Sequence, residues 1–158
     1  MTPNDAATGL FAALPKPVGM DQIQEYGIEI TEAQARHLAR EILSLNLYWI
    51  FAAVDAHIPQ KYRALINGRL FEFVTTQWPA QTFGLETWDG YRQELDERRE
   101  SYARCMDDQL NPMGLSAEAA TLLEDLGVVS SDDRPKLLML LIDYAPVDRY
   151  AELLDDVR

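Results

Sequence analysis

The sequence predicts an all-α fold, a single-domain helical bundle of about six helices. Residues 31–58 read as one long helix that carries no charged side chain between Glu41 and Asp55. A helix that is apolar on nearly all sides must be covered on nearly all sides. Elsewhere the apolar residues recur at helical intervals, and the one ambiguous segment has no second strand with which to pair. We therefore expect the 31–58 helix to be the central element of a helical core.

The length and the N-terminal composition predict the domain organisation. A chain of 158 residues fits one domain, which can bury roughly 70% of the surface exposed by the unfolded chain. Residues 1–20 mix Pro, Gly and Ala without a period, which predicts a loosely ordered N-terminal arm laid over the core through Leu10, Phe11 and Leu14. We expect residues 21–158 to form the single helical domain.

The long helix has a start signal, a stop signal and one polar residue in its centre. Thr31 and Gln34 have the spacing of a capping box, in which two side chains satisfy two backbone amides reciprocally. Pro59 ends the helix. Asn46 interrupts the apolar run, and a buried amide needs hydrogen-bond partners that also fix helix register.

The next segment is the ambiguous one. Apolar residues recur at helical spacing over residues 62–78, but Asn67 and Gly68 in its middle are typical of a turn. Residues 70–76 contain enough aromatic and β-branched side chains for a short strand. We favour a helix, because no other segment offers a second strand.

A third helix is predicted over residues 87–110, starting at Thr87 and ending at Asn111 and Pro112. Its inward seam alternates in steps of three and four, the spacing with which one helix lies along another. The seam consists of Trp88, Tyr91, Leu95, Arg98, Tyr102, Cys105 and Gln109. The i,i+4 pairs expected on this helix are Arg92 with Asp96, Glu94 with Arg98, and Glu100 with Arg104.

Three shorter helices are expected after this one. Ser116 is the predicted N-cap of the first, and Gly127 closes it. The second follows Pro135 and carries the apolar run 137–142, and Pro146 opens the last.

The negative charge of the chain lies mostly in its second half. The formal net charge is −12, and residues 81–158 hold 18 acids and 8 bases, whereas residues 1–80 hold 8 acids and 6 bases. Such a field repels nucleic-acid phosphates and anionic membranes, so neither is an expected partner. A protein with a basic surface is the expected partner, although a net charge also serves solubility alone.

This charge distribution predicts a non-enzymatic cytoplasmic protein-binding module, with a role like that of an immunity protein, a chaperone or a regulator. The candidate partner-binding residues are Glu94, Asp96, Glu97, Glu100, Asp107 and Asp108. The sequence contains no Gly-x-Ser-x-Gly, Walker-type or dinucleotide-binding glycine motif, so we predict no catalytic residue and no cofactor.

Metal binding is not predicted either. The two histidines, His37 and His57, lie on the same predicted helix, about 30 Å apart at ~1.5 Å per residue. His37 and Glu41 have i,i+4 spacing, but Gln34 stands where a Glu-x-x-His pair would need its glutamate.

The alternative function is small-molecule binding, or enzymatic activity, in an aromatic pocket between helices. The residues that would line it are Trp49, Trp78, Trp88, Arg98 and His37. An aromatic core explains the tryptophans equally, and an arginine on an apolar seam either extends to solvent or needs a carboxylate or an aromatic face. A homodimer formed through the apolar faces of the first two predicted helices is compatible with both functions.

Three observations predict a cytoplasmic location. The single cysteine, Cys105, excludes an intrachain disulfide. The apolar run 42–54 is well short of the ~20 residues that span a bilayer. The short apolar stretch 9–14 is cut off by Pro15 and has no basic region before it, unlike an export signal.

Overall fold

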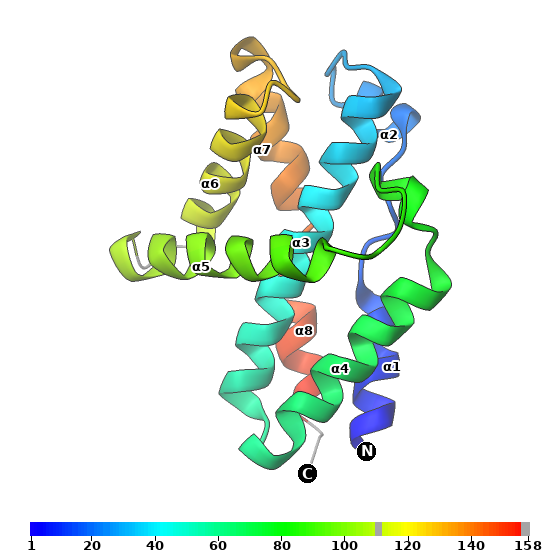
Figure 1. The fold of residues 1–158 in the computed structure, drawn as a ribbon. Helices are drawn as coiled ribbons and strands as arrows, with labels where there is room; N and C mark the ends of the chain where they lie inside the picture. Colours follow the sequence, from blue (N-terminus) through cyan, green and yellow to red (C-terminus); the bar gives the residue numbers. More distant parts are fainter. Residues whose placement is uncertain (110–111, 156–158) are drawn as a thin grey trace. The chain divides into compact units, whose positions relative to one another are not determined.

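The computed structural model describes the backbone of residues 1–109 and 112–155, and the side chains of residues 1–106 and 113–155. Within this part, all regular structure is helical, with eight α-helices, two short 3-10 helices and no strand (Figure 1). The elements are α1 (Pro3–Ala13), α2 (Met20–Glu25), α3 (Glu32–His57), α4 (Gln60–Gln77), η1 (Ala80–Phe83), α5 (Tyr91–Gln109), α6 (Pro112–Asp125), η2 (Ser131–Asp133), α7 (Arg134–Asp143) and α8 (Val147–Leu154). The predicted all-α class is confirmed, and α1 and α2 are additional to the six helices expected.

The chain divides into two compact units, each assembled from separate segments. Unit 1 consists of Met1–Leu14, Asn46–Pro79 and Pro146–Arg158, and unit 2 consists of Pro15–Leu45 and Ala80–Ala145. Helix α3 contributes its first part to unit 2 and its second part to unit 1. In unit 1, α1 packs against α4 and α8 (Figure 1). In unit 2, α6 packs against both α5 and α7.

The N-terminus differs from the loosely ordered arm expected over residues 1–20. Pro3–Ala13 form helix α1, which begins with a capping box: Thr2 Oγ1 accepts from the Asp5 amide, and an Asp5 carboxylate oxygen accepts from the Thr2 amide, both at 3.1 Å. Leu10 is fully buried, and the Phe11 ring lies 5.0 Å from that of Trp78. Pro in the first turn and the cap initiate a helix, and contacts with α4 and α8 stabilise it.

Helix α3 begins as predicted. The Thr31 amide donates to Gln34 Oε1 at 2.8 Å, and the Gln34 amide donates to Thr31 Oγ1 at 3.2 Å, so the capping box is confirmed. Every residue in the range 41–47 is buried, which accounts for the lack of charge after Glu41. Asn46 is buried and accepts a 2.7 Å hydrogen bond from the Tyr150 hydroxyl, which links α3 to α8 within unit 1.

Helix α4 confirms the preference for a helix over residues 70–76. Asn67 and Gly68 lie inside the helix and make no turn. The Asn67 amide oxygen is buried without a hydrogen-bond partner among the described residues. A Cβ placed on Gly68 would meet no atom within 4 Å.

The open space at Gly68 leads to a prediction of stabilisation. Gly68→Ala should raise the free energy of unfolding by roughly 0.5–1 kcal/mol, because alanine loses less backbone entropy in a helix and meets no neighbour. Urea denaturation measures the change. The matched control is Gly127→Ala, which should destabilise because φ is +73° there. A Gly68→Ala variant less stable than the wild type would contradict the placement of Gly68 in an open helical position.

Helix α5 starts at Tyr91, four residues later than predicted. Gly90 has a φ of +83°, and the Asp89 amide donates to Thr87 Oγ1 at 3.2 Å, so residues 87–90 form a turn. Trp88 therefore precedes the helix. The inward positions Tyr91 and Leu95 are buried as predicted. The predicted end at Leu110 and Asn111 lies outside the described residues.

The shorter helices follow the prediction except at one cap. Ser116 is buried inside α6, which begins at Pro112, so it is not an N-cap. Gly127 follows the end of α6 with a φ of +73°, and its carbonyl accepts from Gln34 Nε2 at 3.1 Å. Pro146 precedes α8 as expected.

Candidate functional site

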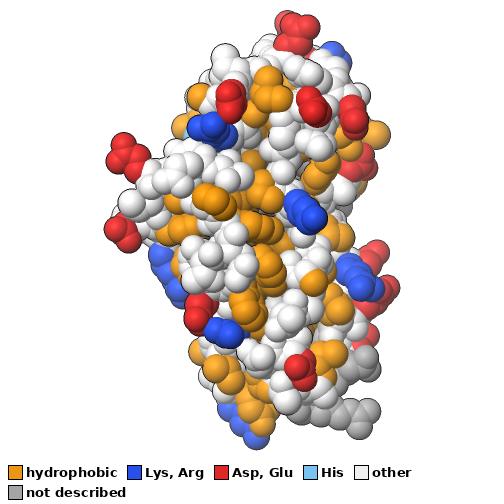
Figure 2. Space-filling view, turned by 90° about the vertical axis from the view of Figure 1, so that its right-hand side faces the viewer, with side chains coloured by type: hydrophobic (Ala, Val, Ile, Leu, Met, Phe, Trp, Pro, Cys, Tyr) orange, Lys and Arg blue, Asp and Glu red, His pale blue; other side chains and the backbone are white. Residues whose placement is uncertain are grey.

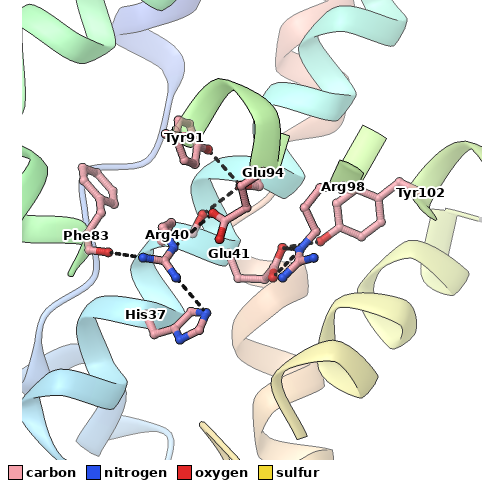
Figure 3. A network of polar contacts seen from close by, with 9 residues as sticks. His37, Arg40, Glu41, Phe83, Tyr91, Glu94, Arg98 and Tyr102 are labelled. Carbon is pink, nitrogen blue, oxygen red and sulfur yellow. Dashed lines mark hydrogen bonds and ion pairs between the residues drawn. The ribbon is translucent and has the colours of Figure 1, made fainter. Parts of the chain in front are cut away.

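The most elaborate polar arrangement in unit 2 links α3 to α5 around one buried carboxylate. The Glu41 side chain is only 2% exposed. Arg98 Nε donates to both carboxylate oxygens, at 2.8 and 3.1 Å, and the Tyr102 hydroxyl donates to one of them at 2.8 Å (Figure 3). We call Glu41, Arg98 and Tyr102 the Glu41 cluster. Both donors to the Glu41 carboxylate, Arg98 and Tyr102, come from α5.

Burial and charge act against each other in this cluster. Burial raises the pKa of Glu41, and Arg98 and the Tyr102 hydroxyl offset part of this effect by stabilising the carboxylate. Burial also raises the pKa of Tyr102 well above its ordinary value, and the Glu41 charge adds to this. Burial would lower the pKa of Arg98, but the adjacent Glu41 carboxylate reverses the direction and raises it. The carboxylate that Arg98 needs on the apolar seam is therefore that of Glu41.

A second set of contacts surrounds Arg40, one residue before Glu41. Arg40 Nε lies 3.1 Å from a Glu94 carboxylate oxygen, and one of its terminal nitrogens donates to the Phe83 carbonyl at 3.3 Å. The other lies 3.2 Å from His37 Nε2. Burial lowers the pKa of His37, and the charges of Arg40 and Arg98 lower it further. His37 is therefore neutral at neutral pH and accepts from Arg40.

A third link lies one turn further along α3. The Ser44 and Tyr91 hydroxyls are 2.8 Å apart, and burial raises the pKa of Tyr91. Together these contacts fix α5 on α3, because charge-assisted hydrogen bonds are directional as well as strong. The chemistry of the arrangement is that of a structural link, since Arg98 and Arg40 both bind carboxylates of the same chain.

The residues predicted to line an aromatic pocket are divided between the two units. His37, Trp88 and Arg98 lie in unit 2, and Trp49 and Trp78 lie in unit 1. His37 and Arg98 come together around Arg40 and Glu41. Each tryptophan packs against aromatic neighbours: the ring distances are 5.8 Å for Trp49 with Tyr48, 5.0 Å for Trp78 with Phe11, and 5.4 and 5.3 Å for Trp88 with Phe83 and Tyr91.

Two surface hollows occur in unit 2, and none of these five residues lines either one. The first lies where residues 29–34 meet the segment 124–131, and its lining residues include three acids, two serines and three apolar residues. The second lies between the start of α3 and residues 81–86. Among the described residues, no group of three His, Cys, Asp or Glu side chains could hold a metal ion.

The predicted acidic residues fall into three groups. Glu94 is half-buried by its ion pair with Arg40. Asp96, Glu97 and Glu100 are exposed on the side of α5 opposite to the Glu41 cluster, and no ion pair between described residues includes them. The side chains of Asp107 and Asp108 lie outside the described residues. We call Asp96, Glu97 and Glu100 the α5 acidic face.

The residues that the sequence interpretation missed are those that hold α5 in place. Glu41, Arg40 and Ser44 occupy one side of α3, and no local signal marks them as partners of residues about 50 positions later. One signal was present, since Arg98 and Tyr102 are four residues apart on an apolar seam, and a buried arginine requires a carboxylate. Glu41, the last charge before the apolar run, was the available acid.

The helices of the described residues include none that is both long and apolar enough to cross a bilayer. Comparison of the chain with known protein families, with curated proteins and with solved structures finds no match.

Proposed function

We propose that this protein is a non-enzymatic protein-binding module whose α5 acidic face binds a basic surface of its partner. The observation that carries the proposal is that three carboxylates project together from a helix whose opposite side is fixed by ion pairs. Asp96, Glu97 and Glu100 fall within about one third of the helix circumference. Arg104 lies on the same side, and the exposed Arg92 stands four residues before Asp96, so this side of α5 carries three acids and two bases.

The fixed position of α5 favours binding. Side chains presented by a rigid element lose less entropy on association than those of a mobile loop. Grouped carboxylates also attract a basic partner over several ångströms and accelerate encounter. On the face that Figure 2 shows, Asp and Glu side chains are interspersed with Lys and Arg, so the charge there is mixed. Binding by charge therefore depends on local groups such as the α5 acidic face.

A cytoplasmic location is part of this proposal, since a chain with one cysteine gains no stability from an oxidising compartment. Immunity, chaperone and regulatory roles all fit a small acidic binding module. Small-molecule binding in an aromatic pocket receives less support, because Arg98 and His37 contact other side chains of the protein itself.

Reversing the three charges tests the proposal. The variant Asp96→Lys, Glu97→Lys, Glu100→Lys should lose the basic protein that the wild type captures from the lysate of its native host. Capture by the wild type should weaken at high salt, because exposed charge pairs are screened within about 10 Å at 0.1 M. Quantitative mass spectrometry of the captured proteins measures both effects.

The matched control reverses three other exposed acids of unit 2, Asp21, Glu25 and Glu29. It makes the same change in net charge, so it should retain the partner if the α5 acidic face is specific. Equal capture by the wild type and the α5 variant would contradict the proposed surface. Equal loss in both variants would show that total charge, and not this face, determines capture.

A further inference from the structure

Helix α7 presents an outward side on which three apolar side chains lie between the exposed side chains of Lys136 and Asp143. Leu137, Leu140 and Leu141 are buried on the inner side. Pro135, Met139 and Ile142 recur at intervals of four and three on the opposite side, as residues on one face of an α-helix do. Met139 is 59% exposed and Ile142 is 37% exposed. We call Pro135, Met139 and Ile142 the α7 apolar face.

Both cations of α7 are directed sideways into contacts within unit 2. Arg134 donates to a Glu124 carboxylate oxygen at 2.7 Å and to the Thr121 hydroxyl at 3.0 Å, on the side where α6 packs (Figure 1). Lys136 Nζ donates to the Gly27 carbonyl at 3.1 Å and lies 3.5 Å from a carboxylate oxygen of Asp133. Both positive charges are therefore paired with carboxylates of the same unit, and Lys136 remains 50% exposed.

The charge that remains beside this face is negative. Asp132 is exposed in η2, three residues before Pro135. Asp143 is exposed four residues after Met139, and its carboxylate accepts a hydrogen bond from the neutral hydroxyl of Tyr26. Since Glu124 and Asp133 balance the two cations, Asp132 and Asp143 leave an excess of two negative charges at the two ends of the face.

We infer that the α7 apolar face is a docking surface for a partner segment that is apolar on one side and basic at its edges. An amphipathic helix with Leu or Ile at i, i+4 and i+7 matches the apolar spacing, and lysines or arginines at its ends match Asp132 and Asp143. The charge distinguishes this occupant from a second copy of the chain. Two copies would bring two molecules of net charge −12 together at an acidic border.

This docking surface is independent of the α5 acidic face, because it combines apolar contact with charge and involves none of the same residues. Exposed apolar side chains that share a face mark interaction sites more often than scattered ones do. The partner of the α5 acidic face needs only a basic surface, whereas the α7 apolar face needs an apolar one as well. The two surfaces can therefore be tested separately.

The test uses a fluorescent amphipathic peptide of Leu and Lys, roughly four helical turns long. Fluorescence anisotropy measures its dissociation constant with the intact protein. The double substitution Met139→Ser, Ile142→Ser should weaken binding at least about tenfold, because central apolar contacts dominate interface affinity. A scrambled peptide of the same composition should bind the wild type more weakly, since it has no apolar side.

The matched control is Leu65→Ser on α4, which removes an apolar side chain with the same 59% exposure as Met139. It should leave peptide affinity unchanged. In a protein whose α5 acidic face is reversed, the Met139→Ser and Ile142→Ser substitutions should still weaken peptide binding. Failure of one proposal therefore does not imply failure of the other. Thermal melts confirm that each variant is folded.

Three outcomes would overturn the inference. The first is equal peptide affinity of the wild type and the Met139→Ser, Ile142→Ser variant. The second is a dimer in light scattering that the same substitutions convert to a monomer, which would assign the face to a second copy. The third is binding to neutral phosphatidylcholine vesicles that depends on Met139 and Ile142, which would assign it to a lipid surface.

Discussion

Replacing Arg98 with alanine is expected to lower the free energy of unfolding by about 3 kcal/mol at neutral pH. The substitution leaves the Glu41 carboxylate 2% exposed and without the cation that contacts both of its oxygens. Removing one partner of a buried ion pair is costly because the remaining charge is neither solvated nor paired. Denaturation by urea, followed by circular dichroism, measures the change.

The cost of Arg98→Ala should depend on pH. Burial raises the pKa of Glu41 in the folded protein, so the folded state binds this proton more tightly than the unfolded chain. The contribution of Glu41 is therefore most favourable below its unfolded pKa and declines as the pH rises through its folded pKa. Removing Arg98 raises the folded pKa further. The difference in stability between the wild type and the variant should thus shrink as the pH falls toward about 4.

A second substitution separates this explanation from simple loss of packing. Adding Glu41→Gln to Arg98→Ala removes the buried charge, so the double variant should be more stable than Arg98→Ala alone at neutral pH. The matched control is Glu94→Gln. Glu94 is 30% exposed whereas Glu41 is 2% exposed, and glutamine keeps an oxygen that can accept from Arg40, so this substitution should cost less than Arg98→Ala. A double variant less stable than Arg98→Ala would contradict a destabilising charge on Glu41.

Truncating Leu10 to alanine is expected to cost about 2–4 kcal/mol of unfolding free energy. Leu10 is fully buried in α1, which packs against α4 and α8, and its loss leaves a cavity. A loosely ordered arm would give almost no change. Thermal and urea denaturation of the full chain measure the effect.

The control for Leu10→Ala is Leu65→Ala, which makes the same chemical change at a side chain that is 59% exposed. Surface substitutions of this kind stay within about 0.5 kcal/mol. If both variants lost the same stability, the burial of α1 against α4 and α8 would be wrong.

Features that depend on nearby residues were predictable from the sequence. The capping box of Thr31 and Gln34 involves residues three apart, and it is present. The helix over residues 70–76 followed from the absence of a second strand, and α4 covers this range. Tyr91 and Leu95 are buried as their spacing indicated. Local hydrogen bonding determines the capping box and periodicity determines the buried positions, whereas the helix over residues 70–76 was inferred by excluding a partner strand.

Features that depend on tertiary contacts were not predictable. Residues 3–13 lack a clear period, and the capping box of Thr2 and Asp5 starts a helix that burial against α4 and α8 stabilises. The partner of Arg98 was expected at Glu94 on the same helix, yet it is Glu41 on α3, because a buried arginine needs an equally buried carboxylate. The same rearrangement pairs Glu94 with Arg40 and leaves only Asp96, Glu97 and Glu100 exposed among the described candidates.

The binding of a basic partner through the α5 acidic face is tested most directly by calorimetric titration with the captured protein. The wild type, the α5 charge-reversal variant and the Asp21, Glu25, Glu29 control would be compared at about 20 mM and about 500 mM salt. We predict that affinity is lost in the α5 variant, is retained in the control, and falls with salt for the wild type. Equal affinity of the wild type and the α5 variant at low salt would contradict the proposed function.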